Sequence, residues 1–334
     1  MVMAGTFSHI AVVRVLYDKH LDEIPGLTDE MKGALRDFGP FLELGSVSPD
    51  YPFFTSLNNE AKGWGNVMHY GPTGRYIKLS IPRLVRLESD EKRHRCLAWL
   101  FGFAAHVITD LTVHPVVKAK VGDYDSHPKQ HRFCELQQDA FIFHEMGYGE
   151  ITTSNVQIGR LMSCSDPANN MRLHPDIKDF WLQMLRTFPL HDIELLNRVS
   201  KPTMTPQTLD FGKWHNNCCD LLGLADKTGH LYPLARFIAE DKAAVYPLPD
   251  EINYDYVTDL QRPDDNQPID FKAVFERTLE QVKGVWQQLS TAITADDAAL
   301  FTLADSNLDT GLAAGKLVAW DNAVPFAAGP VATA

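Results

Sequence analysis

The chain has 334 residues, of which 45% are hydrophobic and 22% charged, so it is typical of a globular protein and excludes a fibre or a largely disordered chain. The formal net charge of −12 repels polyanions, which disfavours a stable complex with nucleic acid. The five cysteines contain no CxxC pair, which argues against cysteine-bound zinc and against a disulfide framework.

The first residues have no basic start, no long apolar stretch and no cleavage pattern, so the sequence predicts no secretory signal. No uninterrupted apolar run reaches the roughly 18 residues that a membrane span needs. We therefore expect a cytoplasmic protein without a transmembrane segment, although export by a route that needs no signal stays open. The sequence does not predict the oligomeric state.

The chain begins with two expected helices. One starts at His9 within an apolar segment over residues 9–16, and a second runs over residues 29–38 with Thr28 as its N-cap. Residues 39–40, Gly-Pro, are then expected to turn the chain.

Two expected loops follow, each with a polar residue that can bind a ligand. Residues 45–52 are rich in turn formers, and Asp50 stands there between two prolines. Such an aspartate either makes a turn hydrogen bond or, held stiffly, binds a metal ion. His69 comes just before a second loop, rich in glycine, at residues 70–74.

Residues 97–113 are apolar on nearly every side, which predicts a helix buried at the centre of the protein. His106 and Asp110 break this pattern four residues apart, on one helix face, and His114 follows one turn later. Because Pro115 disfavours helical geometry in the residue before it, we expect the helix to end at His114.

Asp110 needs a partner, because an ionised carboxylate inside an apolar helix costs several kcal/mol unless it is paired or bound to a cation. A buried polar network with the two histidines is one explanation. A second helix of the same design favours a metal site, since His131, Glu135 and Asp139 stand one turn apart opposite an apolar face. Two such helices can surround divalent metal ions with nitrogen and oxygen ligands. His127, in the loop between them, is a further candidate.

The second half of the chain carries weaker signals. Its clearest pattern is an amphipathic helix over residues 271–293, with an apolar stripe that is core or interface. Residues 247–268 are acidic and proline-rich, which predicts a long loop. Further helices are expected over residues 156–161, 177–185, 214–222 and 232–242, with a linker at 202–206. We expect three parts, a helical domain, a helical region packed on it and a weakly patterned tail, over residues 1–200, 201–312 and 313–334.

These motifs, in this order, resemble the core of the zinc-dependent phospholipase C family, which is related to the P1/S1 nucleases. The segments that carry the resemblance, within roughly residues 5–150, are Ser48-Pro49-Asp50, Met68-His69-Tyr70-Gly71, Gly102 with His106-x3-Asp110-x3-His114-Pro115, and His131-x3-Glu135-x3-Asp139. The resemblance implies an all-α fold, a multi-helix bundle around a metal cluster, with an additional C-terminal helical region.

Matching positions in the resemblance imply which residues hold zinc. The residues implied for one zinc are Asp50, His69, His106 and Asp110, with Asp110 able to bridge to another. Those implied for a second zinc are His114, His131 and Glu135, and those for a third are His9 and Asp110. Asp139 is implied either as an extra ligand or as an acceptor that orients a histidine.

The chain departs from the secreted members of this family in two ways. Those enzymes complete the third zinc with an N-terminal tryptophan, and no tryptophan stands near the start of this chain. The spacing from Asp110 to His114 is also shorter than theirs. We therefore expect two zinc ions, with a third site that lacks one of its usual partners.

The resemblance implies an enzyme, a zinc-dependent phosphodiester hydrolase of phospholipase C type. Clustered metal ions neutralise the phosphate oxygens, lower the pKa of a bound water toward about 7 and place the resulting hydroxide for in-line attack, and Asp50 is a candidate general base. The expected substrate is a phosphate ester, with phospholipids or their head groups as one class.

Two observations on the substrate point in opposite directions. Tyr51 matches an aromatic residue that helps to hold choline by cation–π contact, whereas Asn66 stands where those enzymes have an aromatic. Two alternatives for the function stay open: a P1-like nuclease, which the acidity disfavours, and a non-catalytic protein in which bound metal holds the helices together.

Overall fold

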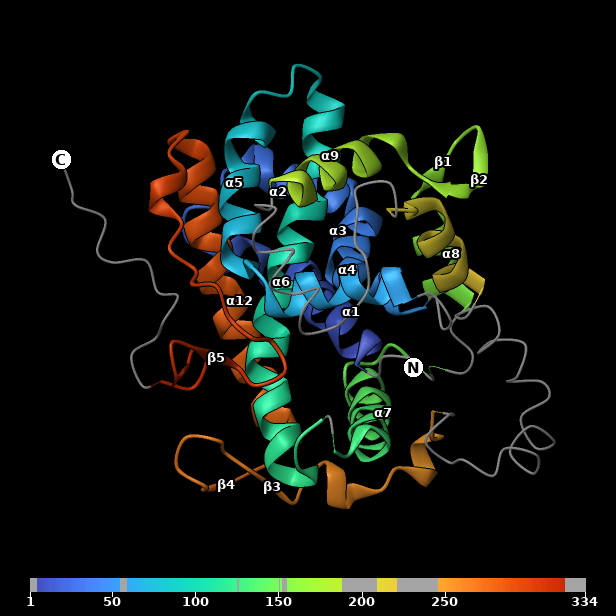
Figure 1. Ribbon diagram of the computed structural model, residues 1–334, viewed down its shortest axis with the longest axis vertical. Coiled ribbons are helices and arrows are strands. Elements are labelled where there is room, and N and C mark those ends of the chain that lie inside the picture. The colour runs from blue at the N-terminus through green and yellow to red at the C-terminus, as the bar shows by residue number, and fades with distance from the viewer. Residues whose placement is uncertain are drawn as a thin grey trace.

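The computed structural model describes residues 5–54, 59–124, 126–149, 151, 155–187, 209–220 and 246–321. Within these residues the protein is built of helices, and its strands form three short antiparallel ribbons (Figure 1). The ribbons are β1 (Ser165–Asp166) with β2 (Asn169–Leu173), β3 (Leu260–Gln261) with β4 (Pro268–Ile269), and β5 (Leu312–Ala313) with β6 (Lys316–Leu317). The predicted all-α class is confirmed.

The helices follow in chain order, with short 3-10 or π turns at Leu16–His20, Leu21–Glu23, Ser48–Phe54, Pro249–Glu251, Tyr254–Tyr256 and Ala298–Leu300. Their bounds are α1 (Thr6–Val15), α2 (Asp29–Asp37), α3 (Gly39–Val47), α4 (Asn59–Tyr70), α5 (Thr73–Val85), α6 (Asp90–Val121), α7 (Pro128–Glu145), α8 (Asn155–Met162), α9 (Pro175–Arg186) and α12 (Phe271–Thr294). Residues 211–220 are also helical. The expected linker at 202–206 and the expected helix at 232–242 lie outside the described residues.

Helix α6 is the central element, as its apolar sequence predicts. Every residue from Arg95 to Val113 is buried, and within the described residues α6 packs against α1, α2, α3, α5, α7, α9 and α12 and against the 3-10 turn Ser48–Phe54. Figure 1 shows it running through the middle of the molecule beside α12. Ser89 caps its start by accepting a hydrogen bond from the Lys92 N–H, and Gly122 ends it with a φ of 92°.

Helices α3 and α6 touch backbone to backbone through two glycines. A Cβ atom built on Gly45 would lie 2.0 Å from the Trp99 carbonyl oxygen, and one on Gly102 would lie 2.0 Å from that of Leu42. No other residue type fits either position without moving a helix. This close contact brings α3 and the 3-10 turn that follows it next to the polar face of α6.

The structure corrects the expected loop at residues 45–52. Gly39 and Pro40 begin α3, with proline in its first turn, where the missing N–H costs nothing. The helix then continues as the 3-10 turn Ser48–Phe54, which carries Asp50. The small residues that resemble turn formers serve the helix contact, since Gly45 lies at the point where α3 meets α6.

The expected end of the central helix at His114 is also wrong. Pro115 lies inside α6, which continues to Val121. A proline in a helix interior removes one backbone hydrogen bond, and here packing outweighs that loss. Pro115 is buried, and Gly311 lies so close that a Cβ atom there would be 2.4 Å from the Pro115 Cγ.

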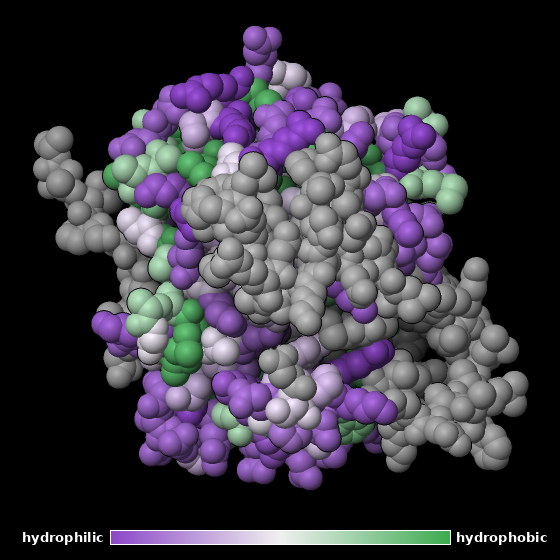
Figure 2. All heavy atoms as spheres, in the orientation of Figure 1, coloured by the Kyte–Doolittle hydropathy of each residue, from purple (hydrophilic) through white to green (hydrophobic). Residues whose placement is uncertain are grey.

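By length and composition α6 could cross a membrane, contrary to the expectation from the sequence. Its 18-residue apolar window is completely buried within the fold, as in the core helix of a globular protein, so the evidence for a span is weak. On the face drawn in Figure 2, hydrophilic side chains predominate over the described surface.

Helix α12 and the segment after it, residues 301–320, pack on the first half of the chain. Trp286 of α12 donates its indole N–H to the Phe101 carbonyl of α6 at 3.0 Å. Trp320 donates to the Thr112 carbonyl, also on α6, at 2.9 Å. The C-terminal part therefore contacts the central helix directly, close to its polar residues.

Candidate metal centre

Four buried side chains from three elements converge on one point. Asp50 comes from the 3-10 turn, His69 from the end of α4, and His106 and Asp110 from one face of α6. Asp50 Oδ1 lies 3.1 Å from His69 Nε2 and 3.9 Å from His106 Nε2. Asp110 Oδ2 lies 3.1 Å from His106 Nε2 and 3.6 Å from His69 Nε2. These four residues form the first ligand set.

The backbone fixes the two imidazoles of this set. The His69 Nδ1 lies 2.8 Å from the Gly65 carbonyl, and the His106 Nδ1 lies 2.8 Å from the Ser46 carbonyl. Because a carbonyl oxygen only accepts, each Nδ1 carries the proton. Each Nε2 is then left to face the carboxylates, which is the arrangement that metal-binding histidines adopt.

The first ligand set is not satisfied by its own members. His106 Nε2, Asp50 Oδ2 and Asp110 Oδ2 are buried and have no hydrogen-bond partner among the described residues. Leaving such groups unsatisfied costs about 1–3 kcal/mol each. Tetrahedral zinc with bonds of about 2.0–2.1 Å holds two ligand atoms about 3.3 Å apart, close to the observed separations. The donor set therefore fits a zinc ion.

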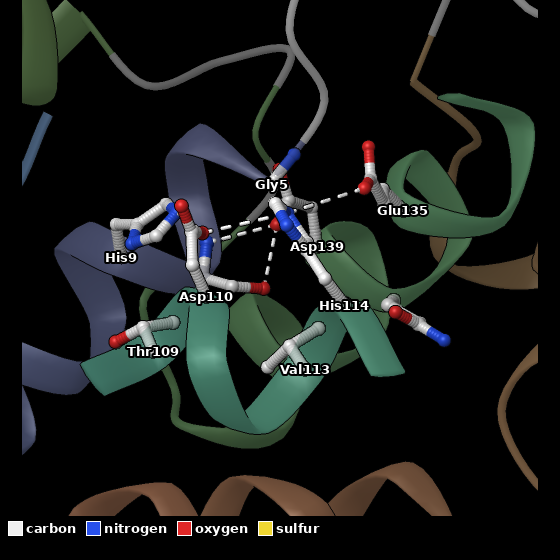
Figure 3. A pocket seen from close by; sticks show the side chains of 10 residues that line it. Gly5, His9, Thr109, Asp110, Val113, His114, Glu135 and Asp139 are labelled. Atoms are coloured by element: carbon white, nitrogen blue, oxygen red, sulfur yellow. Dashed lines mark hydrogen bonds and ion pairs between the residues drawn. The ribbon is translucent and has the colours of Figure 1, made fainter. Parts of the chain in front are cut away.

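A second ligand set shares Asp110 with the first. Asp110 Oδ1 lies 3.1 Å from His9 Nε2 and 3.4 Å from His114 Nε2, which in turn is 3.6 Å from Glu135 Oε1. Figure 3 shows these side chains from α1, α6 and α7 around a small pocket. The cavity has about 10 Å³, room for about one water molecule or one ion.

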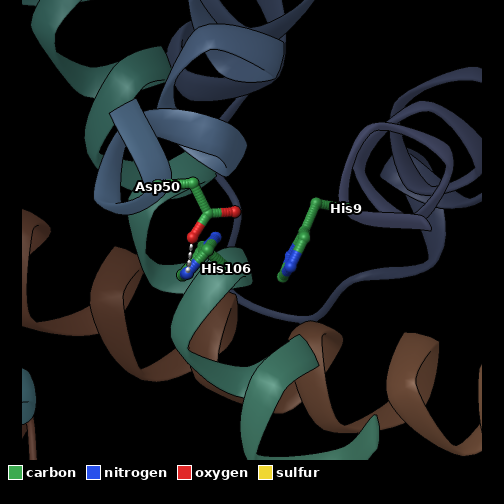
Figure 4. A group of neighbouring side chains, drawn as sticks. All are labelled: His9, Asp50 and His106. Atoms are coloured by element: carbon green, nitrogen blue, oxygen red, sulfur yellow. Dashed lines mark ion pairs between the residues drawn. The ribbon is translucent and has the colours of Figure 1, made fainter. Parts of the chain in front are cut away.

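His9 stands between the two sets. Its ring stacks on His106 with centroids 4.2 Å apart and an interplanar angle of 14°, and Figure 4 shows it facing Asp50 and His106 from α1. One nitrogen of His9, one of His106 and one oxygen of Asp50 all lie within 4.8 Å of one another. His9 Nδ1 has no hydrogen-bond partner among the described residues, and His9 Nε2 is the nitrogen that faces Asp110.

The charges at the centre are strongly coupled. Burial opposes ionisation of Asp110, but the surrounding imidazoles, His114 foremost, hold the pKa of its carboxyl well below the usual value. Burial raises the pKa of Glu135 well above its usual value, and nearby carboxylates, Asp139 foremost, add to this. Both acids therefore depend on neighbouring charge: imidazoles keep Asp110 ionised, and carboxylates oppose the ionisation of Glu135.

The structure brings His9, Asp50, His69, His106, Asp110, His114 and Glu135 together at the two ligand sets. Asp139 also lines the small pocket, whereas His131 and His127 make other contacts. His131 Nε2 lies 2.5 Å from the Gly122 carbonyl, and the ring packs on Tyr124. His127 is exposed at the N-cap of α7. His131 therefore directs its Nε2 to the backbone, and His127 lies at the surface.

Asp139 is directed to the start of α1. It accepts hydrogen bonds from the Ser8 N–H at 2.8 Å, from the N–H groups of Gly5 and Phe7, and from the Tyr246 hydroxyl. Helix α1 has no side-chain cap of its own, so Asp139 caps it from α7. In this way Asp139 holds the helix that carries His9.

The aromatic side chains that suggested a choline pocket are buried. Tyr51 is completely buried, packs on Trp181 and lies 3.4 Å from His215 Nδ1 through its hydroxyl. Trp64 is 1% exposed. The ring at the ligands is Phe53, whose centroid lies 5.2 Å from that of His69.

No pattern in the sequence indicated two residues that lie beside His114. Its Nδ1 is 3.2 Å from the Leu308 carbonyl and 3.8 Å from Asp309 Oδ1. They follow His114 by almost two hundred residues in an unpatterned segment. No periodicity or local spacing could have placed them there.

The fold and this centre define a class, helical proteins in which imidazoles and carboxylates from separate helices enclose divalent metal ions. The family model for zinc-dependent phospholipase C matches residues 8–188, more than half of the chain, and the chain therefore belongs to that family. The resemblance seen in the motifs is thus confirmed, and membership implies zinc. No protein of curated function and no solved structure matches the chain significantly. The match includes every predicted ligand and ends before α12.

Proposed function

We propose that this protein is a zinc-dependent phosphodiester hydrolase of phospholipase C type, with at least two zinc ions held on either side of Asp110. The first ion would be held by Asp50, His69, His106 and Asp110, and the second by Asp110, His114 and Glu135, with His9 on the first turn of α1 completing it. The observation that carries the proposal is the buried Asp110, whose two oxygens face different histidines at 3.1–3.4 Å.

The chemistry of the site suits a phosphodiester. When bound, zinc would neutralise phosphate oxygens. It would also lower the pKa of a water molecule, which could then lose a proton and attack the phosphorus. Asp50 keeps its Oδ2 without a hydrogen-bond partner among the described residues. The neighbouring histidines lower its pKa although burial opposes this, so the carboxylate is ionised at neutral pH and able to accept a proton.

The expected substrate class is a phosphate ester or lipid, as the family suggests. The buried positions of Tyr51 and Trp64 leave no described aromatic cage for a choline group. We therefore propose that recognition is directed to the phosphodiester itself, with head-group selectivity open to experiment. The net charge of −12 disfavours polyanionic nucleic acid as the substrate.

The test combines metal analysis with hydrolysis. Zinc per chain is measured in the purified protein, and turnover is assayed with a bis-aryl phosphate, phosphatidylcholine and single-stranded DNA. We expect at least two zinc ions and hydrolysis of the phosphodiesters, with activity of His106→Ala reduced more than about 100-fold, beyond the range of a residue that only supports a ligand. His94→Ala is the matched control, because His94 lies on α6 but pairs with Glu30 at the surface.

Each contrary outcome points to one alternative. Zinc without turnover of any ester would identify a metal-stabilised scaffold. Turnover of DNA alone would identify a nuclease. Full activity in His106→Ala, with zinc content unchanged, would overturn the site assignment.

A further inference from the structure

The segment 301–320 lies outside the part of the chain that matches the family, yet it is fastened to the helices that carry the ligands. At the start of α5, a Cβ atom on Gly74 would lie 2.1 Å from the Leu303 carbonyl oxygen, so the two backbones touch. Next to this contact, Asp305 accepts from the Arg75 N–H at 2.9 Å and from its guanidinium at 2.5 Å. These contacts fix the position of residues 303–305 against the start of α5.

The conformation of the turn at residues 307–311 is held by its own hydrogen bond and by packing on α6. The Asn307 side chain accepts a hydrogen bond from the Thr310 N–H at 3.0 Å, which closes the turn. Gly311 ends it with a φ of 69° and lies against Pro115 of α6. These two residues fix the positions of Leu308 and Asp309 between them.

The peptide groups of Leu308 link two predicted ligands. Its N–H donates to the His69 carbonyl at 2.9 Å, and its carbonyl lies 3.2 Å from His114 Nδ1. A carbonyl acceptor at Nδ1 requires that this nitrogen carry the proton. His114 Nε2 is then left unprotonated toward Asp110 and Glu135, the state that a metal ion needs.

Asp309 adds a carboxylate on the same side of the His114 ring. Its Oδ1 is 3.8 Å from His114 Nδ1, and its Oδ2 accepts a hydrogen bond from the Tyr70 hydroxyl. Nδ1 and Nε2 lie on different edges of the ring, so Asp309 stands behind His114 and not among the ligand atoms. At this distance Asp309 makes no hydrogen bond to His114, whose Nδ1 proton is directed to Leu308, and it contributes negative charge next to the ring.

We propose that the turn 307–311 is a working part of the metal centre, in which Leu308 and Asp309 are positioning residues that hold His114 ready to bind the second metal ion. This inference rests on the proposed metal-binding function. Asp309 supplies negative charge that makes the imidazole a stronger donor, and Leu308 sets its tautomer and ties it to His69. Tyr70 keeps the Asp309 carboxylate in place.

The experiment compares Asp309→Asn with Asp305→Asn in the full chain. Both changes remove one carboxylate from the same segment, but Asp305 pairs with Arg75 and does not reach His114. Zinc and cobalt affinities are measured by competition with a chelator, and the visible absorption of the cobalt protein reports on ligand geometry. Turnover of a bis-aryl phosphate is recorded alongside.

For Asp309→Asn we expect one metal ion to bind about tenfold to 100-fold more weakly, with an altered cobalt spectrum, while the other ion keeps its affinity. Asp305→Asn should match the wild type in both respects. Asp309→Glu should restore part of the lost affinity, because the charge returns at nearly the same place. Tyr70→Phe should shift the affinity of the same ion in the same direction by less.

Two results would separate the possible failures. If the wild-type protein binds metal and His106→Ala loses it, but Asp309→Asn keeps wild-type affinities and cobalt spectrum, the positioning role is wrong and the proposed function stands. If the wild-type protein binds no metal, the proposed function fails first.

Discussion

Two buried clusters of charge lie close together in this protein and are built on opposite principles. In the first, Glu43 is 1% exposed and lies between two guanidinium groups, with Arg14 Nε at 2.7 Å and Arg160 Nε at 2.8 Å. None of the side-chain nitrogen and oxygen atoms of these three residues is buried without a partner. The metal centre, by contrast, leaves polar atoms of His9, Asp50, His106 and Asp110 unpartnered.

The difference shows how a structural cluster is told from a functional one. Helix α1 contributes to both, through the buried side chains of Arg14 and His9, and each cluster has a buried carboxylate at its centre, Glu43 or Asp110. Burial and charge therefore do not separate them. What separates them is whether every buried donor and acceptor has a partner within the protein, as at Glu43, or some have none among the described residues, as at Asp110.

The largest expected effect comes from a mutation in the Glu43 cluster, where every buried polar atom has a partner. Glu43→Ala leaves the buried Arg14 guanidinium without its carboxylate partner, beside the partly exposed Arg160, so the free energy of unfolding should fall by about 3–5 kcal/mol. Urea unfolding measures this, and zinc per folded chain should stay at the wild-type value. Asp22→Ala, which removes an exposed partner of Arg36, should leave the transition near the wild type. Loss of zinc from folded Glu43→Ala would show that the clusters are not separate.

Removal of metal tests the metal centre, where some buried polar atoms have no partner among the described residues. With free zinc at about 100 times its dissociation constant, zinc should stabilise the folded protein by about 2.7 kcal/mol, and a chelator should remove this. Unfolding is followed with and without chelator in the wild type and in Glu43→Ala. Equal losses in both proteins would show independent clusters, and no loss in the wild type would contradict the proposed centre.

The pH dependence, about 1.4 kcal/mol per pH unit for one proton, sharpens the contrast. Burial lowers the pKa of His69, but hydrogen bonding to Asp50 and the charges of Asp50 and Asp110 raise it to about 9 in the metal-free protein. The stabilisation from this protonated histidine is complete below pH 6.5 and is lost as the pH rises to about 9. Zinc must displace that proton, so its affinity should fall about tenfold per pH unit below pH 9.

Urea unfolding in the presence of chelator, between pH 6 and 9.5, measures the stability change. His69→Gln has no proton to lose in this range and serves as the comparison. A metal-free wild type that gains stability as the pH rises would contradict the assigned contacts of His69.

The central part of the site was predictable because it lies on one helix. His106, Asp110 and His114 span nine residues, and Asp110 in the middle uses one oxygen for each neighbour. The same spacing in α7 was misleading, because residues eight positions apart lie about 12 Å apart along a helix. His131 and Asp139 therefore cannot both reach an ion at Glu135, and they contact Gly122 and α1 instead.

The remainder depended on contacts that a local pattern does not contain. The position of Asp50 follows from the helix contact at Gly45, although its neighbours resemble turn formers. The continuation of α6 through Pro115 depends on packing against Gly311. Leu308 contacts His114 although the two residues lie far apart in the sequence. Each of these is a long-range contact that outweighs a local preference.

The two glycines where α3 meets α6 have one more consequence. Gly102 precedes His106 by one turn, and Ser46, next to Gly45, offers the carbonyl to His106 Nδ1 at 2.8 Å. The spacing of this helix pair therefore governs how firmly one imidazole is seated. Changing a packing residue at this helix contact alone should therefore alter metal selectivity, with every coordinating side chain unchanged.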